Sequence, residues 1–249
     1  LGFEWIGYWL GLGRFQMGVS TSRATWASRW LRDKATEGQV SLGELRQGLG
    51  RLCFIAGPVE HIRPFLGPLY AWSSAGPAFA KPALPVMVVL ILRYLADELA
   101  IESTVECTTG LVELGEVFRL DAKAADDGVA IGGWRTTGTG RAAEAAWFSV
   151  SLTRCNAPWA FAKGEAFRTI ASLELLGALV GMMVLVPEGE RVDSAGTLTL
   201  SCGTDNRGNS FLLDKMLTTR YPLGIILMEA AHQMRKRRLL LRAHWLPRD

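Results

Sequence analysis

The chain has 249 residues, of which 49% are hydrophobic and 20% are charged, and its formal net charge is +3. This composition excludes an intrinsically disordered chain, and the length suffices for one large domain or two small ones with a sizeable core. The net charge is too small to exclude any class of partner. The cysteines are scattered and form no CxxC pair: Cys53, Cys107, Cys155 and Cys202. We expect reduced, mostly buried thiols of an intracellular protein, cytoplasmic or nuclear, that is not secreted.

The ends and the apolar runs indicate neither a leader nor a membrane span. No charged-then-apolar leader opens the chain, so we expect no signal peptide. The longest apolar run, 83–92, is about half of the ~20 residues that a membrane-spanning helix needs. We therefore expect a buried helix there and no membrane partner. The chain starts at Leu1 without Met and stops at Asp249 without a polar tail, so we expect it to be part of a longer protein.

The first part of the chain predicts a short β-like piece followed by helices. Glycines punctuate an aromatic-rich piece at 3–15, and Ser20 begins a run of N-cap residues before the next helix. Ser41-Leu-Gly-Glu44 is a capping box that opens a second helix. Apolar residues at helical spacing predict further helices at 59–72 and 86–99. The small residues and prolines of 73–85 favour a domain boundary there.

From residue 116 onwards short strands dominate the pattern. The expected elements are strand, strand, strand, helix, strand, helix, helix and strand, at 117–122, 129–134, 146–152, 167–186, 197–202, 210–217, 223–237 and 239–246. This order, βββαβααβ, implies a mixed sheet with helices packed on it, which is a mixed α/β fold.

Three carboxylates stand within or at the end of these apolar elements: Asp121, Glu174 and Asp205. Three acids that a fold brings together are a ready site for divalent metal ions, and paired ions cut phosphodiester bonds. Glu174 shares a helix face with Gly177 and Gly181, so this face is expected to lie close to the sheet. A carboxylate there costs on the order of several kcal/mol unless a cation compensates. The cation is either a metal ion or an arginine in a structural salt bridge.

The two aspartates also have simpler interpretations. Asp121 lies within a predicted strand although Asp is a poor strand former, and the alternative is an edge-strand aspartate that faces water. Asp205 follows an apolar strand at its carboxyl end, where the sites of α/β sheets usually lie. Its alternative is an Asx-turn or helix cap, which Asn206 and Asn209 could also provide.

A basic cluster near the C-terminus has two interpretations that the sequence leaves open. Its members are Arg235, Lys236, Arg237, Arg238 and Arg242. These cations could bind phosphates by charge neutralisation. They could equally form a solvated helix end, where positive charge is favoured by the helix dipole.

Two stretches of the chain resemble reverse transcriptases of DIRS-type retrotransposons. The first contains SxxxAxWAxRWLRDK and ELRQGLGRLCFIAGPVEHIRPFLGPLY, and it resembles the end of the palm and the thumb-like helices. The second runs from FRLDAKAADDGVAIGGW through SLELLGALVGMM and TDNRGNSFLLDK to the C-terminal WLPRD, and it resembles the ribonuclease H domain that follows the polymerase. The resemblance implies three parts: 1–72 as palm end and thumb-like region, 73–115 as linker and connecting helix, and 116–249 as a ribonuclease H-like domain truncated at its C-terminus.

The resemblance implies a ribonuclease H-like mixed five-stranded sheet and hydrolysis of RNA in an RNA–DNA hybrid. Asp121, Glu174 and Asp205 match the family's metal-binding acids, which would hold two Mg²⁺ or Mn²⁺ ions. The residues expected to contact nucleic acid are Asn206, Asn209, Arg235, Lys236, Arg237 and Arg238. The family's fourth acid follows the last strand, and Asp249 does not match its position. The palm's catalytic aspartates are missing, so we expect no polymerase activity; the rest of the Pol polyprotein is an implied partner.

Two other functions stay open at this point. A catalytically impaired, nucleic-acid-binding or structural remnant of a retrotransposon Pol would keep the fold but lose efficient cleavage with its fourth acid. A purely structural connection domain would not need the three acids to converge. Convergence of the carboxylates separates the last possibility from the other two, and an activity assay separates those two from each other.

Overall fold

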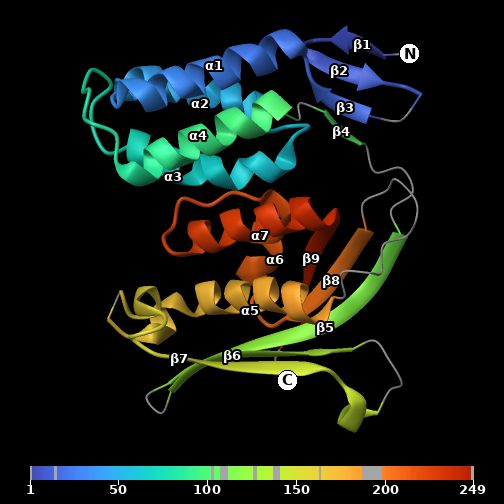
Figure 1. Ribbon diagram of the computed structural model, residues 1–249. Helices are drawn as coiled ribbons and strands as arrows, with labels where there is room; N and C mark the ends of the chain where they lie inside the picture. Colours follow the sequence, from blue (N-terminus) through green and yellow to red (C-terminus); the bar gives the residue numbers. More distant parts are fainter. Residues whose placement is uncertain are drawn as a thin grey trace. The chain divides into compact units, whose positions relative to one another are not determined.

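The computed structural model describes residues 2–13, 16–101, 104–106, 112–125, 128–136, 141–162, 164–186 and 198–247 (Figure 1). The chain divides into two compact units. The first comprises Leu1–Thr109 with Leu217–Arg220, and the second comprises Gly110–Met216 with Tyr221–Asp249.

The first unit opens with a small antiparallel sheet. Its strands lie in the order β1 (Gly2–Trp5), β2 (Tyr8–Gly11), β3 (Gln16–Val19) and β4 (Thr104–Glu106). The sequence predicted one β-like piece over 3–15, whereas the structure has a hairpin there. Ile6 and Gly7 both have positive φ angles (50° and 83°), a backbone that reverses the chain between two short strands.

Four α-helices complete the first unit: α1 (Thr21–Glu37), α2 (Leu42–Ile55), α3 (Arg63–Ser73) and α4 (Val86–Ile101). The predicted capping box is confirmed, because the Ser41 hydroxyl accepts a hydrogen bond from the Glu44 backbone N–H (3.1 Å). Ser28 of α1 donates to the backbone carbonyl of Ala96 in α4 (2.8 Å), which joins these two helices through a buried hydrogen bond.

The proline-rich stretch 73–85 lies within the first unit. The backbone carbonyls of Ala78 and Ala80 accept hydrogen bonds from the N–H groups of Gly43 and Leu42 (2.8 and 2.9 Å). These bonds satisfy donors at the start of α2 that have no partner within the helix. The stretch is thus held against its own unit, and the two units divide near residue 110.

The second unit is built on a five-stranded mixed sheet, as the sequence predicted. Its strands are β5 (Val112–Ala125), β6 (Gly128–Arg135), β7 (Trp147–Leu152), β8 (Leu198–Thr204) and β9 (Leu239–Trp245). They lie in the order β7-β6-β5-β8-β9. β6 is antiparallel to both of its neighbours, and β5, β8 and β9 are parallel to one another.

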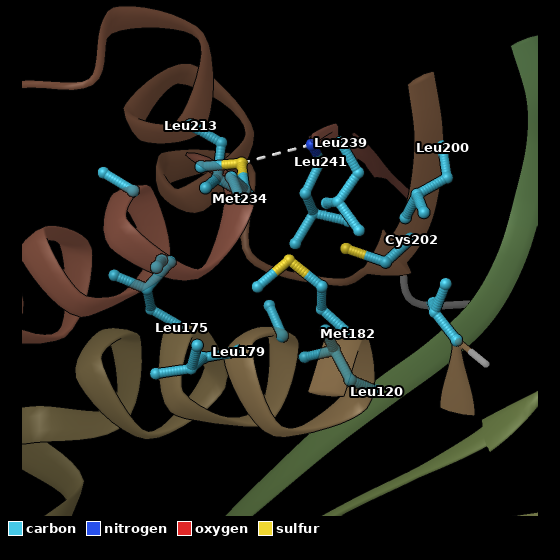
Figure 2. Packing of buried hydrophobic residues seen from close by; sticks show 14 of the residues in the cluster. Leu120, Leu175, Leu179, Met182, Leu200, Cys202, Leu213, Met234, Leu239 and Leu241 are labelled. Carbon is cyan, nitrogen blue, oxygen red and sulfur yellow. Dashed lines mark hydrogen bonds between the residues drawn. The ribbon is translucent and has the colours of Figure 1, made fainter. Parts of the chain in front are cut away.

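Three helices pack on one face of this sheet: α5 (Ile170–Leu185), α6 (Arg207–Lys215) and α7 (Leu223–Arg237) (Figure 1). The predicted order βββαβααβ is therefore confirmed. Figure 2 shows the core between helices and sheet, where Met182 of α5 meets Cys202 of β8 and Leu241 of β9. The Leu241 backbone N–H donates to the Met234 sulfur (3.2 Å), so the core also satisfies a strand donor.

The burial of the cysteines differs in part from expectation. Cys202 is buried, and burial raises the pKa of its thiol to about 12. Cys53 and Cys155 are exposed, so the expectation of mostly buried thiols is wrong for these two, and Cys107 lies outside the described residues.

Within the described chain one helical stretch, Ala166–Val184, has the length and composition of a membrane span. This stretch includes α5, the central helix in the core of the second unit. A helix buried in a core has the same apolar composition as a membrane-spanning helix.

Two glycines let α5 approach β5 closely, and they differ in how much space surrounds them. A Cβ at Gly181 would lie 2.5 Å from the ring of Phe118, which is fully buried. A Cβ at Gly177 would meet Leu120 at 3.6 Å, an ordinary contact. We expect Gly181→Ala to lower the free energy of unfolding by about 1–2 kcal/mol because the core is overpacked. Gly177→Ala should raise it by about 0.5–1 kcal/mol because Ala favours helix.

Urea unfolding of the two variants checks this prediction, and each serves as the control for the other. Both changes add one methyl group to the same face of the same helix, so helix propensity cancels in the comparison. Equal effects of the two substitutions would show that α5 does not contact Phe118 at this depth.

Candidate functional site

Two of the three predicted acids lie on neighbouring strands of the mixed sheet. Asp121 is in β5, and Asp205 directly follows the last residue of β8. The two strands pair in parallel, with Arg119 opposite Gly203. Continued by two residues, this register sets Asp121 opposite Asp205. The fold thus brings together two acids that are far apart in the sequence.

Asp121 is exposed on a central strand, so it is no edge-strand aspartate. Its neighbours in β5, Leu120 and Ala122, face the helices and are buried. The Asp121 Oδ1 atom accepts a hydrogen bond from the backbone N–H of Ala122 (2.8 Å). Its partner on the neighbouring strand β6 is Gly132, which has no side chain that could contact the carboxylate.

Glu174 approaches the same region from the helix layer. It lies in α5 and is only 3% exposed. The Thr204 hydroxyl at the end of β8 donates to its Oε2 atom (3.4 Å), and the Asn206 side chain also forms a hydrogen bond with it. Within the described chain, no arginine, lysine or histidine forms an ion pair with Glu174. The structural salt bridge that the sequence left open is thus not formed by these residues.

The pKa of Glu174 is raised from its usual 4.5 to about 7. Burial is the largest cause, and the negative charge of Asp205 is the next. The charge of Asp121 raises the pKa further, while the hydrogen bonds from Thr204 and Asn206 lower it. Both aspartates are therefore near enough for their charges to act on the buried carboxyl.

The three acids lie near the end of β8 without forming a closed metal-binding group. In the described ranges, no three or more His, Cys, Asp or Glu side chains form a group that could hold a metal ion as they stand. Mutual repulsion of three carboxylates opposes closer approach when no cation is bound. The donors are all hard oxygens, which suits Mg²⁺ or Mn²⁺. The donor set is therefore chemically suited to such ions.

The two asparagines after β8 serve the fold directly. The Asn206 Oδ1 atom accepts from the backbone N–H groups of Gly208 and Asn209 (2.9 and 3.3 Å), so Asn206 is the N-cap of α6. Asn209 is 4% exposed, and its Nδ2 atom donates to the Ala171 carbonyl (2.9 Å), which ties α6 to α5. The helix cap that the sequence offered as an alternative for Asp205 is provided by Asn206. Both asparagines hold the loop that carries Asp205.

The basic cluster is divided between structural and exposed cations. The guanidinium of Arg237 donates to the carbonyl oxygens of Met182 (3.1 Å) and Met183 (3.3 Å) in the last turn of α5, and of the C-cap residue Val186 (3.5 Å). It therefore caps the C-terminus of α5, which favours positive charge. Arg238 ends α7 in the left-handed conformation (φ 53°), and the side chains of Arg238 and Lys236 are exposed. Lys236 and Arg238 remain candidates for phosphate contact.

The structure adds residues that no sequence pattern indicated. The Trp245 Nε1 atom donates to the backbone carbonyl of Asp205 (3.1 Å). The Arg207 guanidinium lies 5.7 Å from the ring centroids of both Phe211 and Trp245. An aromatic residue at the end of the last strand does not by itself indicate contact with the loop of Asp205.

A second group of charges bridges β5 and β9 near the acids. The Glu116 carboxylate contacts Arg119 Nε (2.7 Å) through one oxygen and His244 Nε2 (2.7 Å) through the other. Gly203 lies between them, and a Cβ there would be 3.2 Å from the Glu116 Oε2 atom. The glycine therefore leaves room for a bridge between strands that are not neighbours.

Comparisons with known proteins give a distant match. No protein-family model matches the chain, and no curated protein matches it. Similar solved structures include the foamy viral protease-reverse transcriptase dRH with double-stranded DNA (TM-score 0.32), and the foamy viral protease-reverse transcriptase with RNA/DNA hybrid and with double-stranded DNA (TM-score 0.31 each), all at 13% identity. The matches cover 100% of this chain but 38%, 30% and 46% of those chains, so it spans less than half of their length. A likeness this distant identifies neither a family nor an activity.

Proposed function

We propose that the second unit is a ribonuclease H-like nuclease domain from the reverse transcriptase of a retroelement. It would hydrolyse the RNA strand of an RNA–DNA hybrid with two divalent metal ions. The observation that supports the proposal is that Asp121 and Asp205 belong to neighbouring parallel strands and that the charges of both raise the pKa of the buried Glu174, although the three residues are remote in sequence. The element order βββαβααβ, which the sequence pattern predicted and the structure has, supports the same function.

The chain's own residues prepare this site for cations. Asp121, Glu174 and Asp205 would hold the ions, which when bound activate water and stabilise the leaving oxygen. Glu174, with its raised pKa, gives up its proton when positive charge arrives beside it. The hydrogen bonds from Thr204 and Asn206 hold its carboxyl in place. These groups fix the buried acid, while Asp121 remains open to solvent for the substrate.

The substrate would be recognised by shape and charge. Selectivity for RNA would come from contacts to 2′-hydroxyl groups and to the form of the hybrid helix. Among the cations of the basic cluster, Lys236 and Arg238 are exposed and suited to phosphate contact. The proposal includes the rest of a Pol polyprotein as partner and an intracellular place of action, cytoplasmic or nuclear.

Cleavage of a labelled hybrid tests the proposal. With the chain in excess and Mg²⁺ or Mn²⁺ present, we expect cuts in the RNA strand and an intact DNA strand. A DNA duplex of the same sequence is the control and should stay whole. Omission of the divalent ion should stop cleavage. Hybrid binding without cleavage under both ions would contradict a nuclease and support the catalytically impaired remnant.

A further inference from the structure

An arginine flanked by two aromatic rings lies on the loop that carries Asp205. Arg207 is the first residue of α6, two positions after Asp205, and it is exposed. Its guanidinium lies 5.7 Å from the ring centroid of Phe211, one turn further along α6, and 5.7 Å from that of Trp245 at the end of β9. Both distances are within the range of cation–π contacts. A helix and a strand together therefore hold one cation close to Asp205.

Trp245 fixes the place of this cation relative to Asp205. Its Nε1 atom donates to the Asp205 carbonyl oxygen (3.1 Å), while its ring lies beside the Arg207 guanidinium. One side chain thus contacts both the proposed metal ligand and the arginine. Asn206 caps α6 with its side chain, so hydrogen bonds fix the connection from Asp205 to Arg207.

The guanidinium of Arg207 keeps its hydrogen-bond donors for an acceptor outside the chain. Among the described residues, no carboxylate forms an ion pair with Arg207 and no oxygen accepts a hydrogen bond from its guanidinium. Contact with aromatic rings stabilises the positive charge without pairing the five N–H donors with oxygen acceptors. A cation in the first turn of a helix is also disfavoured by the helix dipole, so the charge itself does not stabilise α6. The donors are therefore available to a ligand that carries negative oxygens.

We infer that Arg207 binds a phosphate of the substrate strand beside the acids, and that Phe211 and Trp245 are positioning residues for its guanidinium. The inference rests on the proposed function, which brings a nucleic-acid strand to Asp205. Two phosphate oxygens can accept parallel hydrogen bonds from the planar guanidinium fork, which suits this group better than a point charge does. The acids repel the phosphates of an approaching strand, and a cation held at this place offsets part of that repulsion.

Hybrid binding without divalent ions tests this contact, because no cleavage is then expected. The affinity for a labelled RNA–DNA hybrid is measured by fluorescence anisotropy over a range of salt concentrations. Arg207→Gln should weaken binding roughly tenfold and reduce the slope of log affinity against log salt by about one, as for one lost phosphate contact. Arg207→Lys should keep the slope, because the charge remains, but bind less tightly, because the fork is lost. Lys215→Gln, which removes an exposed charge from the other end of α6, is the matched control and should keep the wild-type slope.

Phe211→Leu separates positioning from contact. The substitution keeps an apolar side chain but removes one ring, so binding should weaken about two- to fivefold while the salt slope stays that of the wild type. Wild-type affinity of this variant would overturn the positioning role of Phe211. Thermal unfolding of each variant checks that the fold is intact.

The inference and the proposed function can fail separately. An unchanged salt slope in Arg207→Gln, or an equal reduction in Lys215→Gln, overturns the phosphate contact even if the wild-type chain cuts the hybrid. A hybrid that binds through Arg207 but stays uncut with Mg²⁺ and with Mn²⁺ supports the contact and contradicts the nuclease alone.

Discussion

Asp121→Asn should abolish cleavage of the RNA strand while binding of the hybrid persists. The substitution removes the negative charge and keeps the shape of the side chain. The Asn Oδ1 atom can still accept the hydrogen bond from the Ala122 N–H that Asp121 accepts at 2.8 Å. Asp121 is also exposed, so we expect a small change in the free energy of unfolding. A loss of activity can then be assigned to the site.

The expected loss of the single-turnover cleavage rate is roughly a hundredfold or more, because a missing ligand misplaces the ions in a reaction that depends on their position. Hybrid binding should change little, since it rests mainly on cations that contact phosphates. Asp214→Asn is the matched control: it is the same change at an exposed acid of α6. A wild-type rate in Asp121→Asn would show that Asp121 is not a metal ligand.

The elements of the second unit could be predicted because their patterns are local. Phe118, Leu120 and Ala122 alternate with Arg119 and Asp121 in the sequence, as one face of a strand does, and these three residues are buried in the structure. The helix 223–237 was predicted with its observed bounds from apolar spacing alone. Pairing between strands is not local, so the sequence could not show that Glu116 reaches His244 across β8.

The roles of polar side chains were harder to predict than the positions of the acids. Asn206, Asn209 and Arg237 were expected to contact nucleic acid, and each is bonded to the backbone of its own chain. A residue type shows which hydrogen bonds a side chain can make, but the partner depends on the tertiary structure. Arg237 illustrates this, because the end of α5 that it caps is far away in the sequence. The last carbonyl groups of a helix have no partner within the helix and need such donors.

The domain organisation depended on composition, which gives weaker evidence. Prolines and small residues favoured a boundary at 73–85, yet this stretch supplies carbonyls to the first turn of α2. Prolines disfavour regular helix and strand, but their carbonyl groups still accept hydrogen bonds. The division near residue 110 lies close to residue 116, where the predicted pattern changes from helices to strands.

Glu174→Gln should make the protein more stable at pH 8 and change its stability little at pH 5. In the folded state the Glu174 pKa is about 7, whereas its usual value is 4.5. Between pH 4.5 and about pH 7 the Glu174 carboxyl therefore holds a proton in the folded state that it has released in the unfolded state. The free energy of unfolding therefore falls as the pH rises through this window, by up to about 3 kcal/mol from this group. Gln cannot ionise, so its variant lacks this loss.

The difference in free energy of unfolding between variant and wild type isolates the effect of Glu174, because all other groups titrate in both proteins. Urea unfolding at pH 5 and pH 8 measures it, and Glu165→Gln, the same change at an exposed glutamate, is the matched control. Mg²⁺ at pH 8 should stabilise the wild type more than the Gln variant, because a bound cation favours the ionised carboxyl. A difference that is equal at both pH values would mean that the fold does not hold Glu174 protonated. The buried acid would then lack the electrostatic coupling to Asp121 and Asp205 on which the proposed metal site depends.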